Sequence, residues 1–120
     1  MARNILVVED NALAAGAIQA LLESDGYVVR IADSVEAAID ACTGEPADLM
    51  LLDLTLPDGD GLSVLAAAAE MGRLPKTTVA LTGHDDPAVT ARCREAGCHD
   101  VLLKPVPARE LLARAAMWLA

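Results

Sequence analysis

The sequence predicts a single α/β domain in which helices cover both faces of a parallel sheet. Five short apolar stretches alternate with five segments whose apolar residues recur at helical spacing. Right-handed crossovers between parallel strands place such helices on both faces of one sheet. The chain has 120 residues, of which 54% are hydrophobic, so we expect one domain, 1–120, with a core of its own. The predicted architecture is therefore a doubly wound (βα)5 domain.

The predicted strands are rich in valine, leucine and isoleucine. They lie at residues 4–8, 27–31, 49–53, 77–82 and 99–103. The third strand is apolar without alternation up to Asp53, which is typical of a strand buried on both faces. Asp53 is thereby expected at the carboxyl end of that strand, the edge at which open α/β sheets bind their ligands.

The predicted helices are bounded by residues that cap or break helices. Asn11 and Ser34 are plausible N-caps, while Asp25-Gly26, Gly44 and Gly97 end helical patterns. The third helix ends near Gly72, the fourth runs from about residue 86 to 96, and the fifth from about 107. The expected inward-facing residues of the last three helices are Leu62, Leu65, Ala66 and Ala69; Val89, Cys93 and Ala96; and Leu111, Leu112, Ala115, Trp118 and Leu119.

Composition excludes several classes of function. The formal net charge of -9 disfavours binding to nucleic acid or to an anionic membrane. Cys42, Cys93 and Cys98 lack metal-ligand spacing and are expected to be buried, reduced fillers. No signal peptide is recognisable, and no apolar run approaches the roughly twenty residues that span a bilayer. We therefore expect a cytoplasmic protein.

Polar residues collect where four of the predicted strands end. Glu9 and Asp10 follow the first strand, Asp53 ends the third, Thr82 ends the fourth and Lys104 follows the fifth. Three carboxylates at one edge repel one another, so positive charge is expected among them. Lys104 supplies one charge, and carboxylate and carbonyl oxygens suit Mg²⁺ as a second source.

This set of groups matches the requirements of phosphoryl transfer. Asp53 is an oxygen nucleophile, Asp10 would hold the metal ion, and Glu9 would order its waters. Lys104 and Thr82 would donate hydrogen bonds to oxygens of the transferring group. The alternative interpretation of Asp53 is a carboxylate that only caps a loop, since aspartate is common in turns.

Four motifs resemble the receiver domain of two-component response regulators. They are Val8-Glu9-Asp10-Asn11, Asp53-Leu54-Thr55-Leu56-Pro57 with Gly61, Leu81-Thr82-Gly83, and Lys104-Pro105. The resemblance extends over nearly the whole chain, and the motifs occur in the family's order and spacing. It implies a flavodoxin-like fold with strand order 2-1-3-4-5.

The resemblance also implies a role for each matching residue. Asp53 corresponds to the phosphoacceptor, which receives its phosphoryl group from a histidine kinase or a histidine phosphotransfer protein. Glu9 and Asp10 correspond to the acidic pair of the Mg²⁺ site, and Thr55 to the position whose backbone carbonyl completes it. Thr82 and Lys104 correspond to the switch hydroxyl and the phosphate-binding lysine. The Lys104-Pro105 bond is often cis in this family.

The expected function is a signalling receiver with no output domain in this chain, acting on an unidentified protein partner. It would catalyse only its own phosphorylation and dephosphorylation. A phosphohydrolase of the haloacid dehalogenase type needs a second acid two residues after its nucleophile, where this chain has Thr55. A pseudo-receiver that binds partners without phosphorylation is disfavoured by the complete set of acidic and phosphate-binding residues.

Val101 occupies the position at which receivers carry an aromatic residue that turns inward on activation. A valine is too small for that movement. Two alternatives follow: a rearrangement of the loop at Gly83 and His84 carries the signal, or the domain mainly passes phosphate on. His84 could also affect hydrolysis, although an exposed loop histidine without a catalytic role is the simpler interpretation.

Overall fold

The computed structural model describes residues 2–120 and contains a five-stranded parallel sheet. The sheet strands are β1 (Asn4–Val8), β2 (Val28–Ala32), β3 (Leu49–Asp53), β6 (Thr77–Thr82) and β7 (Asp100–Leu103). The helices are α1 (Ala12–Ser24), α2 (Val35–Ala41), α3 (Leu62–Glu70), α4 (Pro87–Ala96) and α5 (Ala108–Trp118). The order β2-β1-β3-β6-β7 confirms the predicted 2-1-3-4-5 arrangement, because the two intervening strands form a separate hairpin.

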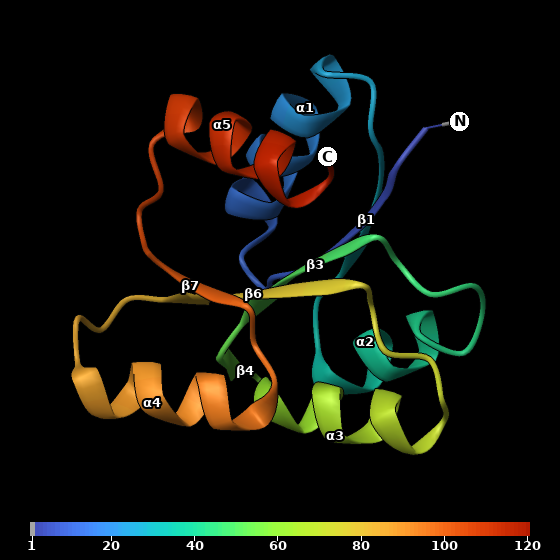
Figure 1. Cartoon of the computed structure of the whole chain (residues 1–120), viewed down its shortest axis with the longest axis vertical. Helices are drawn as coiled ribbons and strands as arrows, with labels where there is room; N and C mark the ends of the chain where they lie inside the picture. The colour runs from blue at the N-terminus through green and yellow to red at the C-terminus, as the bar shows by residue number, and fades with distance from the viewer. Residues whose placement is uncertain (1) are drawn as a thin grey trace.

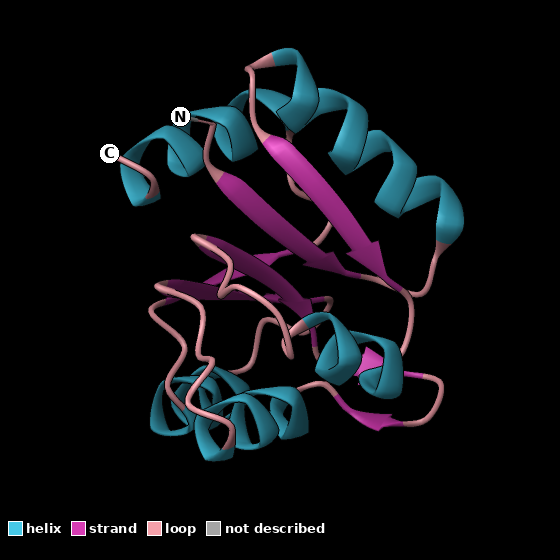
Figure 2. Cartoon of the chain, turned by 90° about the vertical axis from the view of Figure 1, so that its right-hand side faces the viewer, coloured by secondary structure: helices cyan, strands magenta, loops and turns pink. Residues whose placement is uncertain are grey.

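Helices cover the sheet on both faces, as expected for a doubly wound domain (Figures 1 and 2). Helices α1 and α5 lie on one face, and α2, α3 and α4 on the other (Figure 1). The sheet therefore has a hydrophobic core on each face. In β1, Ile5 and Val7 lie in the core between the sheet and helices α1 and α5, and Leu6 and Val8 lie in the core between the sheet and helices α2, α3 and α4. All five residues of β3 are buried, which explains its unbroken apolar run.

The predicted caps are present at the helix ends. Asn11 Oδ1 accepts a hydrogen bond from the Ala14 N–H at 3.0 Å, and Ser34 Oγ accepts one from the Ala37 N–H at 3.0 Å. Gly97 ends α4 with a φ of 108°, a left-handed conformation that favours glycine. These local signals mark the starts of α1 and α2 and the end of α4.

Three details differ from the prediction. Two short strands that the sequence did not predict, β4 (Thr55–Leu56) and β5 (Gly59–Asp60), pair as a hairpin before α3. The buried face of α3 includes Val64 and Ala68, whereas Ala66 and Ala69 are exposed. The four consecutive alanines, 66–69, are equally hydrophobic and do not indicate which of them faces the core, so the predicted buried face of α3 was wrong in part. Ala96 is also exposed, because α4 buries only Cys93.

The three cysteines are free and buried, as predicted. Burial raises the pKa of the Cys98 thiol to about 12, with Cys93 beside it adding to the rise. These thiols are neutral fillers rather than nucleophiles. Among the described residues, no helix is both long and apolar enough to cross a membrane.

Candidate functional site

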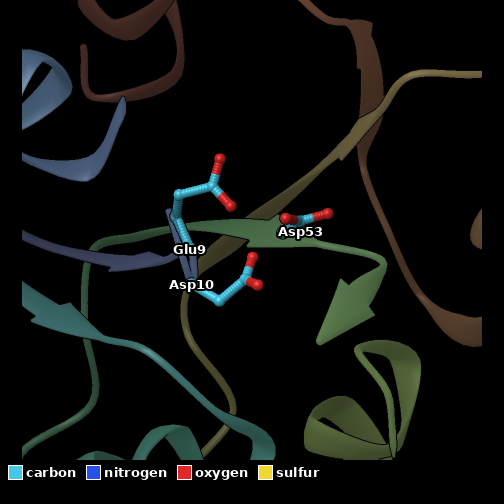
Figure 3. Close-up of side chains that lie close together, drawn as sticks. All are labelled: Glu9, Asp10 and Asp53. Carbon is cyan, nitrogen blue, oxygen red and sulfur yellow. The ribbon is translucent and has the colours of Figure 1, made fainter. Parts of the chain in front are cut away.

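The predicted polar residues meet at the carboxyl edge of the sheet. Glu9 and Asp10 directly follow β1, and Asp53 is the last residue of β3. Their carboxylates face one another across the gap between these neighbouring strands (Figure 3). One oxygen from each of the three carboxylates lies within 4.8 Å of the others. The fold therefore brings together acids that are more than forty positions apart in sequence.

The three carboxylates differ in their exposure to solvent. Glu9 is 3% exposed and Asp53 is 6% exposed, whereas Asp10 is exposed. Glu9 Oε2 is buried and has no hydrogen-bond partner among the described residues. A buried carboxylate oxygen without a partner is costly unless a cation or water satisfies it.

Lys104 joins the two buried carboxylates. Its Nζ donates a hydrogen bond to Glu9 Oε1 at 2.8 Å and to Asp53 Oδ2 at 3.0 Å. The Thr55 N–H donates to the other Asp53 oxygen, Oδ1, at 3.1 Å. The Lys104-Pro105 bond that follows is cis. The two oxygens of Asp53 are thus oriented by donors from two different segments, the start of β4 and the residue after β7.

The pKa values of these groups separate the roles of the two buried acids. Burial raises the pKa of Glu9, and neighbouring Asp53 adds to the rise. Burial also opposes ionisation of Asp53. Its interaction with Glu9, the carboxyl that takes up a proton more readily, and the hydrogen bonds from Lys104 and the Thr55 N–H outweigh burial and lower the pKa of Asp53. Burial alone would lower the pKa of Lys104, yet its bonds to Glu9 and Asp53 raise it. Asp53 is therefore the carboxylate kept ionised, as a nucleophile requires.

A cavity of about 410 Å³ opens beside Asp53. Its lining residues come from the carboxyl ends of β3 and β6, from the segments that follow β1, β3, β6 and β7, and from α4. They are Asp10, Asp53, Leu54, Thr55, Thr82, Gly83, His84, Val89, Arg92 and Lys104. Thr82 is buried, and its Oγ1 accepts a hydrogen bond from the His84 N–H at 3.1 Å. The hydroxyl of Thr82 and the ammonium of Lys104 therefore border the same space as Asp53.

Two features of the site were missed by sequence reasoning. Arg92 is exposed and also lines the cavity, a role that the sequence did not suggest, although its position three residues after Val89 could have indicated it. Gly61 approaches Asp53 so closely that an added Cβ would overlap the Asp53 carbonyl oxygen. The Gly61 N–H donates to the Leu54 carbonyl at 2.9 Å, which holds the hairpin against the end of β3.

The fold and this acidic site define a receiver of the response regulator class. The family profile described as the response regulator receiver domain matches residues 5–116. The chain therefore belongs to this family, which acts in two-component signalling.

Individual relatives agree with this assignment. The transcriptional regulatory protein AruR of Pseudomonas aeruginosa is 35% identical over 124 residues, a match that covers 96% of this chain and 48% of AruR. The chain spans about half the length of the curated relatives it matches.

Two solved structures with related sequences are described with divalent cations. The receiver domain of a sensor histidine kinase from Pseudomonas aeruginosa is 29% identical to this chain, with a TM-score of 0.86. The match covers 99% of this chain and 98% of that one, and the structure is described with a magnesium ion in the active site cleft. A response regulator from Burkholderia pseudomallei, 29% identical with a TM-score of 0.82 over 92% of this chain and 65% of that one, is described with a phosphorylated aspartic acid and a calcium ion.

Proposed function

We propose that this receiver accepts a phosphoryl group on Asp53 in the presence of Mg²⁺, from a histidine kinase or a histidine phosphotransfer protein. The observation that carries the proposal is the environment of Asp53. Its carboxylate is buried, kept ionised by Lys104 and the Thr55 N–H, and adjacent to two further carboxylates. A capping role alone does not require two other acids or a lysine.

The proposed transfer is a displacement at phosphorus. One oxygen of Asp53 attacks, an O–P bond forms, and the P–N bond to the donor histidine breaks, leaving its electron pair on the imidazole, which takes up a proton. Lys104 Nζ can donate to a phosphoryl oxygen, and the Thr82 hydroxyl borders the space where a second oxygen would lie. These two donors would stabilise the negative charge on the oxygens of the phosphoryl group during transfer.

The residues present fit a hard divalent cation. The unpartnered Glu9 Oε2 and three clustered carboxylates form an oxygen-rich, negatively charged site. Asp10, Asp53 and the Thr55 backbone carbonyl would hold Mg²⁺, and Glu9 would order its waters. When bound, the ion neutralises charge on the phosphoryl oxygens. Weak binding is expected, because Mg²⁺ retains much of its hydration in such sites.

Phosphorylation is proposed to alter binding to a protein partner or to allow onward transfer of the phosphoryl group. We propose no action on other substrates beyond the domain's own phosphorylation and dephosphorylation. The net charge of -9 argues against nucleic acid and anionic membrane as direct partners of this domain. The buried, unpaired cysteines are compatible with a reducing compartment such as the cytoplasm.

The test is labelling with a small phosphodonor. The protein is incubated with acetyl phosphate and Mg²⁺, and the adduct is detected by intact mass. We expect one phosphoryl group per chain, released by hydroxylamine and absent without Mg²⁺. Asp53→Asn should abolish the adduct, whereas Asp85→Asn, an exposed loop acid nearby, should retain it. Equal labelling of the Asp53→Asn variant would contradict the proposal.

A further inference from the structure

Arg92 is shared between the cavity beside Asp53 and an ion pair at its rim. It lines the cavity, and its Nη1 lies 3.4 Å from Asp60 Oδ2 on the hairpin. The Arg92 side chain is 56% exposed and that of Asp60 is 48% exposed, so water screens this pair strongly. The contact to Asp60 is therefore easily exchanged for a stronger one.

The charges at the site show why a second cation is needed after phosphorylation. Glu9, Asp10 and Asp53 carry three negative charges when ionised, and Lys104 with a bound divalent cation would balance them. Phosphorylation replaces the single charge of Asp53 with roughly -1.5 to -2. The excess negative charge then lies in a cavity whose only permanent cations, among the described lining residues, are Lys104 and Arg92.

We propose that Arg92 is a second phosphoryl ligand, and that its guanidinium leaves Asp60 to bind the phosphoryl group on Asp53. The inference rests on the proposed function. A guanidinium suits this role because its planar fork can donate two hydrogen bonds to phosphate oxygens. The phosphoryl group carries more charge than the Asp60 carboxylate and lies in a less solvated place, so the exchange is favourable.

The exchange changes how α4 is attached to the rest of the domain. Asp60 Oδ1 still accepts the Leu62 N–H at 3.0 Å, so the hairpin stays fixed to the start of α3. Asp58 accepts the N–H groups of Val35 and Glu36 at 2.8 and 3.0 Å, which fixes the hairpin to α2. The hairpin loses only the ion pair between Asp60 and Arg92 of α4.

Helix α4 is suited to respond to this change. It buries one residue, Cys93, and is otherwise half-buried or exposed. Pulling Arg92 toward Asp53 while releasing Asp60 shifts α4 relative to α3 without displacing a large part of the core. This route links phosphorylation to the surface of α4 and requires no aromatic residue at Val101.

The experiment measures the affinity of the Mg²⁺-loaded protein for beryllofluoride, a non-covalent phosphoryl analogue, by calorimetric titration. Arg92→Ala should weaken binding by about tenfold or more, because it removes charge-assisted hydrogen bonds. The matched control is Arg94→Ala on the same helix, which is exposed and outside the cavity and should bind within about twofold of the parent. Urea unfolding of each variant checks that the fold is retained.

A second variant tests the competition directly. Asp60→Asn frees Arg92 and should tighten binding by roughly two- to fivefold, in keeping with a weak surface ion pair. That gain should vanish when Arg92→Ala is also present. The inference is overturned if Arg92→Ala behaves like Arg94→Ala, or if Asp60→Asn tightens binding equally without Arg92. Failure of the unsubstituted protein to bind the analogue with Mg²⁺ would instead overturn the proposed function itself.

Discussion

Replacing Lys104 by methionine removes the ammonium that contacts both buried carboxylates and keeps most of the aliphatic side chain. Glu9 and Asp53 then face each other at 3% and 6% exposure without this cation between them. Breaking a buried ion pair by removing one partner costs about 3–5 kcal/mol. Because the Lys104 side chain is 31% exposed, solvent screening reduces the expected loss to about 2 kcal/mol.

The loss of unfolding free energy in Lys104→Met should depend on pH and on Mg²⁺, and the direction of each effect can be predicted. The raised pKa of Lys104 means that its contribution is complete at neutral pH and is lost only as pH rises through its folded-state pKa. Glu9 has a raised pKa, so lowering the pH protonates it and relieves repulsion in the variant. The destabilisation should therefore be smaller at about pH 5 than at about pH 8. A bound divalent cation should restore part of the loss.

The assay is equilibrium urea unfolding with either chelator or Mg²⁺. With a slope of about 2 kcal/mol per molar urea, Lys104→Met should lower the midpoint by about 1 M in chelator. Lys76→Met is the matched control, because Lys76 Nζ lies 3.3 Å from Asp48 but its side chain is 70% exposed. It should cost about 0.5 kcal/mol or less, independent of Mg²⁺. Equal losses in both variants, or no recovery of Lys104→Met with Mg²⁺, would refute the reasoning.

Two further changes test the hairpin beside the site. Asp58→Ala removes the acceptor for two N–H groups at the start of α2 and should speed amide hydrogen exchange there relative to Asp33→Ala. The lowered pKa of Asp58, caused by those donors, predicts that the cap is complete at neutral pH and lost only as pH falls through that pKa. Gly61→Ala forces a Cβ against the Asp53 carbonyl and should cost about 1–3 kcal/mol in urea unfolding and slow labelling by acetyl phosphate. Gly44→Ala, which has open space, should change neither; similar losses in both glycine variants would contradict the close approach.

The fold could be predicted because its signals are local and regular. Apolar runs define the strands, caps such as Asn11 and Ser34 define the helix starts, and right-handed crossovers leave few topologies. The rotation of α3 could not be predicted, because four consecutive alanines give every face the same hydrophobicity. The hairpin was also missed, since two-residue strands leave almost no pattern.

The clustering at the site was predictable for a related reason. In a parallel sheet the carboxyl ends of neighbouring strands coincide, so Asp53 had to meet the acids that follow β1. The position of Lys104 among the carboxylates was expected from their mutual repulsion, and its bonds to Glu9 and Asp53 agree with that expectation. The pairing of Arg92 with Asp60 was not predictable, because it depends on the distance between segments far apart in sequence. The chemical roles of the site residues stay predictions: Glu9, Asp10, Asp53, Thr55, Thr82 and Lys104.

The central claim, that Asp53 is the phosphoacceptor, is tested most directly by locating the modified residue. Protein treated with acetyl phosphate and Mg²⁺ is reduced with borohydride, which converts an aspartyl phosphate into homoserine, and the peptides are then sequenced by mass spectrometry. The proposed chemistry predicts homoserine at position 53 only when Mg²⁺ is present. Homoserine at Asp10 or at the exposed Asp58 instead, or none at any position, would contradict it.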